Sequence, residues 1–157
     1  VRLHHSSSTN HNIEQFKEKE NLKKRFPLIK IDDGVINLQR LVNKNKLFVF
    51  AYDGTGILEF LLSDIPFIAF WSDETNHLID DREILELYEE FYEVGIFFKS
   101  GKDASIALNK RWNDIIGWWN SKNVKVAKEK FMNKFSSHKE NTVRNLVEIL
   151  KKQTNLL

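Results

Sequence analysis

Residues 47–71, LFVFAYDGTGILEFLLSDIPFIAFW, decide the fold class of this chain. The stretch contains an apolar strand, a polar turn with glycines, a short apolar helix, an Ile-Pro break and a second apolar strand. A β-α-β unit of this kind joins two parallel strands. Because ligands bind at the carboxyl ends of such strands, the stretch predicts an α/β fold and a binding site at its turn. The turn contains Asp53, Gly54, Thr55 and Gly56.

On both sides of this stretch, strand-like and helix-like apolar spacings alternate. Alternation of this kind requires crossover connections and therefore a parallel sheet. Ser100 followed by Asp103 is a helix-capping signal. The flanking elements that we expect are helices at 11–25, 36–42, 84–92, 104–119, 124–135 and 143–150, and strands at 28–31 and 95–98.

Composition limits the class of protein. The chain has 157 residues, of which 41% are hydrophobic and 29% charged, as in one ordinary globular domain. A net charge of +2 argues against bulk binding to nucleic acid. The absence of cysteine excludes disulfides and thiolate zinc sites and permits a cytosolic setting. No apolar run approaches the roughly 20 residues that span a bilayer, and no signal peptide is visible.

The beginning of the chain bears on its domain organisation. It starts with Val1 rather than methionine, and Val1-Arg2-Leu3 looks like the end of a strand already under way. We therefore expect a fragment whose N-terminal lobe lies elsewhere. Residues 1–120 are predicted to form a Rossmann-like lobe, and residues 121–157 a helical tail packed on the same domain.

The central turn suggests a specific chemistry. If Thr55 caps the helix, Glu59 lies about 40° from it, so the two share one polar stripe. Gly54 and Gly56 allow close backbone approach, and the free N–H groups of a helix start favour an anion. A phosphate there, with Glu59 near a sugar hydroxyl, would make a nucleotide-sugar cradle. The alternative is an ordinary capping threonine and an ordinary glutamate that complements the helix dipole.

Residues 51–70 resemble the donor-site segment of GT-B glycosyltransferases and of their relatives, the CDP-glycerol glycerophosphotransferases. The wider pattern is similar to a family of bacterial surface-carbohydrate transferases. Its elements occur in the same order through most of this chain, as Arg2-Leu3, Phe26-Pro27-Leu28-Ile29-Lys30-Ile31-Asp32, Thr55 with Glu59, Pro66 with Trp71, Val94-Gly95-Ile96 and Trp118-Trp119. The resemblance implies the C-terminal, donor-binding lobe of a GT-B fold.

The resemblance also implies roles for single residues. Thr55 and its neighbouring amides, together with Asp53, would contact the donor phosphate or sugar, and Glu59 a ribose or sugar hydroxyl. Arg2 and His4 match a basic-x-His element near the phosphates in the glycerophosphotransferases. Two departures are visible. His5 stands where that element continues with proline, and the acid of the turn is displaced by one position.

The function implied is transfer of a sugar or polyol phosphate from a nucleotide-activated donor to a carbohydrate or lipid-linked acceptor in bacterial surface-carbohydrate biosynthesis. The expected setting is the cytoplasm, with peripheral association at the inner face of the membrane left open. No cofactor, metal or nucleic acid is implied, and the catalytic base is expected in the missing N-terminal lobe. The alternatives are a hydrolysing nucleotide-sugar epimerase of related fold and a non-catalytic nucleotide-binding module.

Three further groups offer weaker candidates. The His4-His5 pair could ligate a metal, but adjacent strand residues point to opposite faces. Trp118 and Trp119 could stack on a sugar, although packing is favoured because Trp119 continues an apolar helix face. The third group is a polar run after the second strand, which could contact a sugar or a metal. The simpler interpretation of this run is a solvated loop followed by a helix start. Its residues are Asp73, Glu74, His77, Asp80, Asp81 and Arg82.

Overall fold

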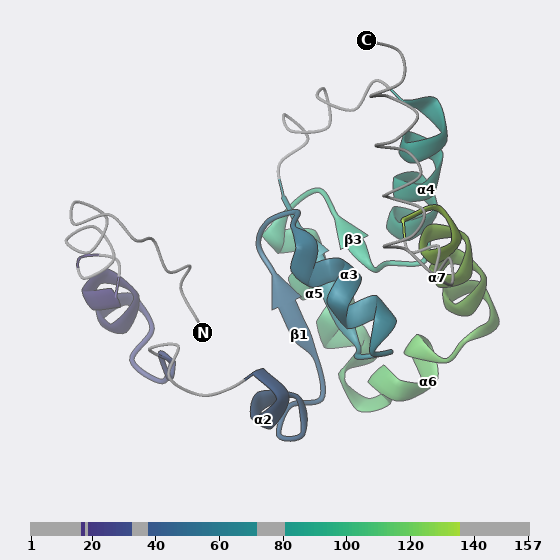
Figure 1. The fold of residues 1–157 in the computed structure, drawn as a ribbon. Coiled ribbons are helices and arrows are strands. Elements are labelled where there is room, and N and C mark those ends of the chain that lie inside the picture. The colour runs from purple at the N-terminus through teal and green to yellow at the C-terminus, as the bar shows by residue number, and fades with distance from the viewer. Residues whose placement is uncertain (1–16, 18, 33–37, 72–80, 136–157) are drawn as a thin grey trace, which may run out of the picture. The chain divides into compact units, whose positions relative to one another are not determined.

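The computed structural model describes residues 17, 19–32, 38–71 and 81–135 (Figure 1). The chain divides into two compact units, residues 1–45 and 46–157, and each is considered by itself. Across the described ranges, no helix is long and apolar enough to cross a membrane. The predicted helix at 143–150 lies outside the described residues, and the predicted limits at 1–120 and 121–157 stay a prediction.

In the first unit, residues 19–25 are helical and α2 spans Leu38–Val42. The strand predicted at 28–31 is wrong. The backbone turns at Pro27 and Leu28, the N–H of Ile29 donates to the carbonyl of Phe26 at 3.0 Å, and Leu28 is 97% exposed. Proline at the second position of a four-residue turn supplies the φ angle that the turn needs. Here the preference of proline for a turn outweighs the preference of the apolar residues after it for a strand.

The second unit contains an open parallel sheet of three strands in the order β1-β2-β3. The strands are β1 (Phe48–Phe50), β2 (Phe67–Phe70) and β3 (Phe97–Phe98), with Phe48 opposite Phe67 and Ala69 opposite Phe97. Helix α3 (Thr55–Leu62) connects β1 to β2, and α4 (Arg82–Glu93) lies between β2 and β3. The predicted α/β fold with a parallel sheet is confirmed.

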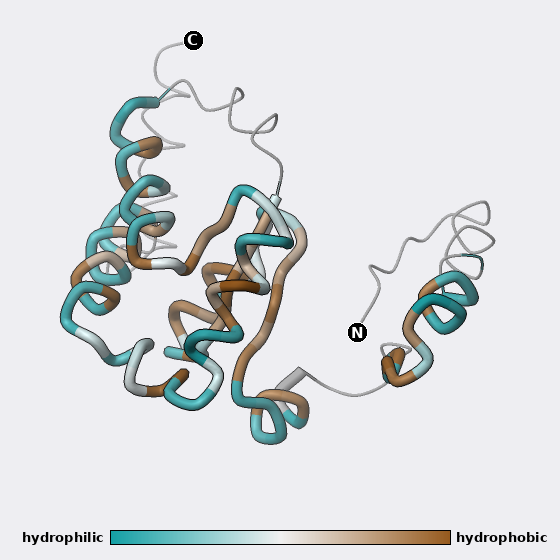
Figure 2. Tube along the Cα trace, turned by 180° about the vertical axis from the view of Figure 1, so that it is seen from behind, coloured by the Kyte–Doolittle hydropathy of each residue, from teal (hydrophilic) through white to brown (hydrophobic). Residues whose placement is uncertain are grey.

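Both faces of this sheet carry helices (Figures 1 and 2). On one face, Phe60 of α3 lies 4.7 Å from Phe48 and 5.0 Å from Phe50, measured between ring centroids. On the other face, α5 (Gly101–Arg111) brings Gly101 against the ring of Phe70. Such cover on two sides lets parallel strands be apolar throughout their length.

The helix predicted over 104–119 is interrupted. After α5, a 3-10 turn (Trp112–Asp114) precedes α6 (Ile115–Trp119), because the side chain of Asp114 accepts the N–H of Gly117 and caps a new helix. The interruption moves predicted core positions outward, so Trp112 is 52% and Ile116 58% exposed. Ala104, Ile115 and Trp119 are buried as expected.

The C-terminal described helix, α7 (Lys122–Phe135), packs against α3 and α4. Its buried residues are Val124, Ala127 and Phe131. Phe131 stacks on Phe91 of α4 with centroids 4.4 Å apart. Two ion pairs join the exposed sides of the helices, Lys130 with Glu90 and Lys134 with Glu83. The structure thus has the helical C-terminal part that the sequence predicts.

Helices α3 and α4 end in the same way. Ile65 N–H donates to the carbonyl of Phe60 at 2.9 Å, and Ile96 N–H to that of Phe91 at 2.9 Å, which is the bond pattern of a Schellman cap. The pivotal residue has positive φ in both caps, 51° at Asp64 and 72° at Gly95. A side chain at Gly95 would collide with the guanidinium of Arg111. The Val-Gly-Ile motif therefore contains a helix cap.

Candidate functional site

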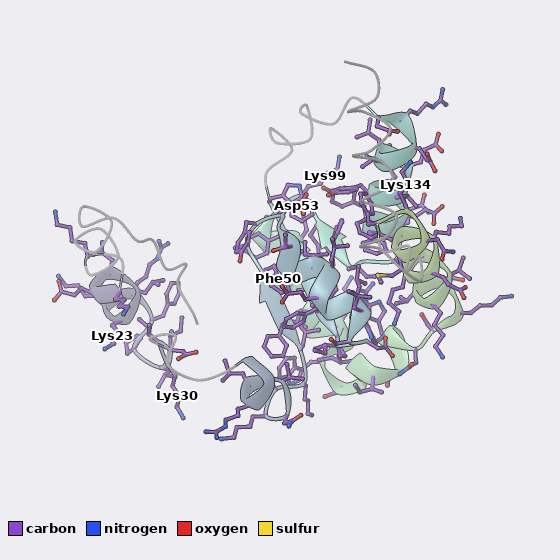
Figure 3. The ribbon with its side chains drawn as sticks, in the orientation of Figure 1. Lys23, Lys30, Phe50, Asp53, Lys99 and Lys134 are labelled. Carbon is purple, nitrogen blue, oxygen red and sulfur yellow. The ribbon has the colours of Figure 1, made fainter. Side chains whose placement is uncertain are left out.

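The carboxyl ends of the strands bring together residues from distant parts of the second unit. Because the strands are parallel, the turn after β1 and the residues after β3 lie at the same edge of the sheet. Asp53 follows β1 and Lys99 follows β3, and Figure 3 shows both at this end. The residues directly after Trp71, 72–80, are outside the described part of the chain.

Helix α3 begins at this edge without a side-chain cap. Gly54 is the N-cap residue, with extended backbone, and Thr55 is the first helical residue. The prediction that Thr55 caps the helix is therefore wrong, because glycine occupies the capping position. Ile57 N–H donates to the Gly54 carbonyl at 3.0 Å, so the amides of Thr55 and Gly56 precede the first bond of the helix and are open to a ligand.

The start of α3 differs from the starts of α4, α5 and α6. The side chains of Asp81, Ser100 and Asp114 accept N–H groups at the starts of α4, α5 and α6. At each of those three starts, a side chain of the protein already accepts at least one of the N–H groups. An anion would meet fewer internal competitors at α3.

Neighbouring rings approach both glycines of the turn, but only the ring at Gly56 is held in place by packing. A Cβ atom on Gly54 would lie 2.8 Å from the ring of Tyr52, and one on Gly56 would lie 3.2 Å from the ring of Phe50. The first contact is with a half-exposed side chain, whereas Phe50 packs in the aromatic group around Phe60. Gly56 therefore has a packing role whether or not a ligand approaches.

Thr55 and Glu59 both lie on the exposed side of α3, while Ile57, Phe60 and Leu61 are buried. This is the separation of polar stripe and packing face that the helical spacing predicts. The roles of Thr55 and Glu59 towards a donor stay a prediction. Their exposure leaves both side chains accessible from solvent.

Asp53 is held by a residue that the sequence did not single out. The hydroxyl of Tyr88, on α4, donates to Oδ2 of Asp53 at 2.6 Å. Burial raises the pKa of Tyr88 well above its usual value, and the hydrogen bond and charge of Asp53 raise it further. The phenol is thus protonated at neutral pH and serves as a donor. The available signal was a tyrosine within an apolar helix face, because a buried phenol usually needs a polar partner.

Lys99 is a second residue at this edge that the sequence pattern did not single out. Its ammonium lies 5.7 Å from the ring centroid of Tyr92. The available signal in the sequence was the position of Lys99 directly after the strand predicted at 95–98. The central turn also directly follows a predicted strand. At this edge, Lys99 provides positive charge close to where β3 ends.

Several predicted site residues cannot be placed. Arg2 and His4, with His5, Asp73, Glu74, His77 and Asp80, lie outside the described residues. Asp81 caps α4, and Arg82 pairs with Glu86 at 3.2 Å on the exposed side of that helix. Among the residues that the structure describes, no three His, Asp or Glu side chains are grouped to hold a metal ion.

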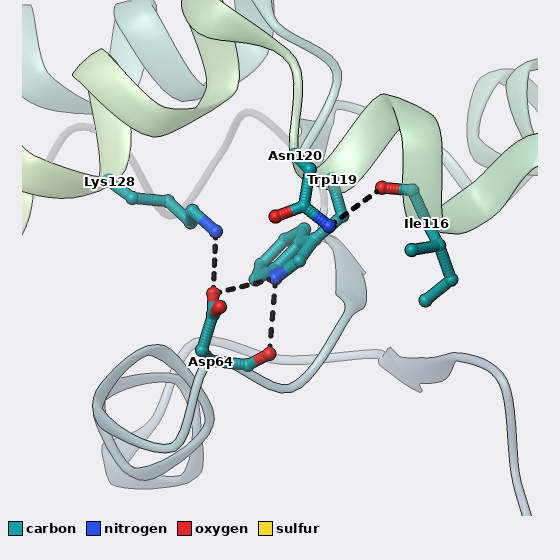
Figure 4. Close-up of polar contacts among 5 residues, drawn as sticks. All are labelled: Asp64, Ile116, Trp119, Asn120 and Lys128. Carbon is teal, nitrogen blue, oxygen red and sulfur yellow. Dashed lines mark hydrogen bonds and ion pairs between the residues drawn. The ribbon is translucent and has the colours of Figure 1, made fainter.

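The opposite end of α3 carries a polar cluster of another kind (Figure 4). The indole N–H of Trp119 donates to Oδ1 of Asp64 at 2.9 Å, and Nζ of Lys128 donates to the same oxygen at 2.7 Å. Partial burial alone would raise the pKa of Asp64, but the hydrogen bond and charge of Lys128 outweigh it and lower that pKa. Trp119 is 1% exposed, so its predicted packing role is confirmed.

The chain matches the model of a known protein family. No curated protein and no solved structure matches the chain. The model of a transferase family, described as LIC12162 family transferase, matches residues 1–150 and thus nearly the whole sequence. Together with the open helix start at the carboxyl edge of a parallel sheet, this match gives the chain its class: it belongs to the LIC12162 family of transferases.

Proposed function

We propose that this chain is the donor-binding lobe of a GT-B-type glycosyltransferase or a related transferase. In this proposal, the start of α3 binds the diphosphate of a nucleotide-activated sugar or polyol. The observation that carries the proposal is the start of α3, which lacks a side-chain cap and lies at the carboxyl edge of the sheet. The partial positive charge of a helix start and its free N–H groups favour a phosphate there. Membership of a transferase family supports this use.

The neighbouring side chains suit the remaining parts of such a donor. The exposed hydroxyl of Thr55 is a donor for a phosphate oxygen, and Lys99 brings positive charge at the end of β3. The carboxylate of Glu59, one helical turn beyond Thr55, is an acceptor for a ribose or sugar hydroxyl. Arg2 and His4 are proposed as further phosphate contacts.

The proposed chemistry is electrostatic. As the bond to the transferred group breaks, negative charge grows on the leaving nucleotide. Amides and cations that are already in position stabilise this charge without reorganising. We propose that the N-terminal lobe of the same enzyme supplies the base that activates a carbohydrate or lipid-linked acceptor. The setting proposed is bacterial surface-carbohydrate synthesis, in the cytoplasm or at the inner face of the membrane.

Titration calorimetry tests the donor site. The 157-residue chain is titrated with UDP, GDP and CDP and with UDP-glucose, GDP-mannose and CDP-glycerol. We expect at least one of these to bind, and both Thr55→Val and Glu59→Gln to weaken its binding by about tenfold, as expected for loss of a charge-assisted hydrogen bond.

The matched control is Glu89→Gln, which changes an exposed glutamate on α4. It should leave binding unchanged. Failure of the folded chain to bind any of the six compounds would overturn the proposal. Equal losses in Glu59→Gln and Glu89→Gln would show that the effect is not specific to Glu59, which would also contradict the assigned site.

A further inference from the structure

One hydrogen bond ties α4 to the turn that precedes α3. Tyr88 donates to Oδ2 of Asp53 across 35 positions of sequence. Asp53 is exposed, and within the described ranges this is the one bond that its carboxylate makes. Its other oxygen, Oδ1, therefore keeps its acceptor capacity.

The donor side of this bond is fixed in place. The ring of Tyr88 lies 5.3 Å from that of Phe97, 5.8 Å from Phe131 and 6.1 Å from Trp71, measured between centroids. These contacts join it to β3, to α7 and to the residue after β2. A hydroxyl on a ring packed from three sides has little freedom, so the bond orients the exposed carboxylate and not the reverse.

The carboxylate has no role in the helix that it precedes. Gly54, not Asp53, is the N-cap of α3, and no side chain caps that helix. An aspartate at a helix start commonly accepts the first N–H groups, but here its Oδ2 is turned to Tyr88. This leaves an acceptor and a set of free amide donors next to each other.

A free phosphate does not suit this combination, since the carboxylate repels it while the amides attract it. A ligand with a hydroxyl close to its phosphates satisfies both groups, because a carboxylate only accepts hydrogen bonds and a hydroxyl donates them. Nucleotide-activated sugars and polyols carry hydroxyls on both sides of the diphosphate, on the ribose and on the transferred group.

We propose that Asp53 accepts a hydrogen bond from a hydroxyl of the donor, and that Tyr88 is the positioning residue that aims its carboxylate. This inference rests on the proposed function, because it needs a donor at the start of α3. It adds a specificity: the site selects hydroxyl-bearing nucleotides over inorganic diphosphate.

The experiment measures dissociation constants for wild type, Asp53→Asn, Tyr88→Phe and the double variant. The ligands are whichever of UDP-glucose, GDP-mannose and CDP-glycerol binds wild type, its free nucleoside diphosphate, and the 2′-deoxy form of that diphosphate. Each single variant should weaken binding by about five- to tenfold. The double variant should lose no more than Asp53→Asn alone, since Tyr88 acts through Asp53.

The ligands identify the hydroxyl. A loss seen with the complete donor and absent with the free diphosphate assigns the contact to the transferred group. A loss seen with the diphosphate and absent with its 2′-deoxy form assigns it to the ribose. Tyr92→Phe is the matched control, because Tyr92 is on the same helix and packs on Trp71 and Phe97 as well. It should leave every dissociation constant unchanged.

Two outcomes would overturn the inference. If Asp53→Asn tightens binding while Tyr88→Phe has no effect, the carboxylate only repels phosphate. If both variants bind like wild type while Thr55→Val still weakens binding, the donor site stands and this inference alone fails. Wild type that binds no nucleotide would instead overturn the proposed function. Asp53→Asn, at an exposed position, keeps the test valid should Tyr88→Phe lower the stability.

Discussion

The two ends of α3 each carry an exposed aspartate bonded to a side chain far away in sequence, but their partners differ. Asp64, after the helix, accepts from the ammonium of Lys128 and the buried indole of Trp119. Asp53, before it, accepts from the neutral hydroxyl of Tyr88, and among the described residues it has no cationic partner. Among the described residues, the charge of Asp64 is thus paired with a cation, whereas the bond to Asp53 comes from a neutral hydroxyl.

This difference suggests that one end of α3 stabilises the fold and that the other end is available to bind a ligand. The Asp64 end is joined to α6 and α7, which fixes the helix against the rest of the unit. The open Gly54 end can then keep its position without a cap of its own. Unsatisfied groups cost free energy unless a ligand or water meets them, so we expect changes at Asp64 to affect folding and changes at Asp53 to affect binding.

The largest expected effect comes from removing the indole at the Asp64 end. Trp119→Ala should lower the free energy of unfolding by about 3–5 kcal/mol, because it empties a buried position and removes the donor to Asp64. Urea denaturation measures it. Trp112→Ala is the control, since Trp112 is 52% exposed, and should cost less than about 1 kcal/mol. Equal losses of unfolding free energy in the two variants would show that the Asp64 end does not contribute more to stability than an exposed tryptophan does.

A smaller effect is expected from the aspartates themselves. Asp64→Asn keeps a residue type that tolerates positive φ and removes the charge that pairs with Lys128. It should lower the free energy of unfolding by about 1 kcal/mol, since the pair is partly exposed. Asp53→Asn should change it by less than about 0.5 kcal/mol. The comparison fails if Asp53→Asn proves the more destabilising of the two in thermal melts.

Acid should remove the contribution of Asp64. Because the pKa of Asp64 is lowered on folding, its charge stabilises the folded state above the unfolded pKa of about 3.9. This stabilisation is lost as pH falls through the lower folded pKa. The difference in melting temperature between wild type and Asp64→Asn should therefore be constant from pH 7 to about pH 5 and shrink towards pH 3. A difference that is as large at pH 3 as at pH 7 would contradict the assigned pair.

The smallest effect on stability is expected at the open end of α3. Gly54→Ser should raise the free energy of unfolding by roughly 0.3 kcal/mol, because its hydroxyl can accept a free N–H of the helix. The new Cβ would lie 2.8 Å from the ring of Tyr52, and that half-exposed ring has room to move away. The same hydroxyl competes with the donor phosphate, so affinity should fall while stability rises. Calorimetry and urea denaturation of one sample measure both. A Gly54→Ser variant with higher stability and also higher affinity for the donor would contradict the binding of a ligand by these amides.

Sequence reasoning succeeded where the deciding interactions are local. The strands and helix of residues 47–71 follow from apolar runs separated by a glycine turn and a proline break, and the structure has these elements. Ser100 caps α5 by accepting the N–H of Asp103 at 3.1 Å, as predicted. Sequence reasoning failed where two local signals competed. At Pro27 the turn preference of proline competed with an apolar run that is typical of a strand. At Asp114 a helix-capping side chain competed with a continuous helical spacing.

For the candidate site, the sequence by itself determined which residues follow the strands and which side of α3 is polar, because both depend on periodicity. Only the tertiary structure decided that Tyr88 bonds Asp53 across 35 positions and that Lys128 bonds Asp64 across 64. Helical spacing places Tyr88 on an apolar face. The position of its hydroxyl, however, depends on how the ring packs against Phe97 and Phe131. That packing depends on three elements at once, and no local pattern contains it.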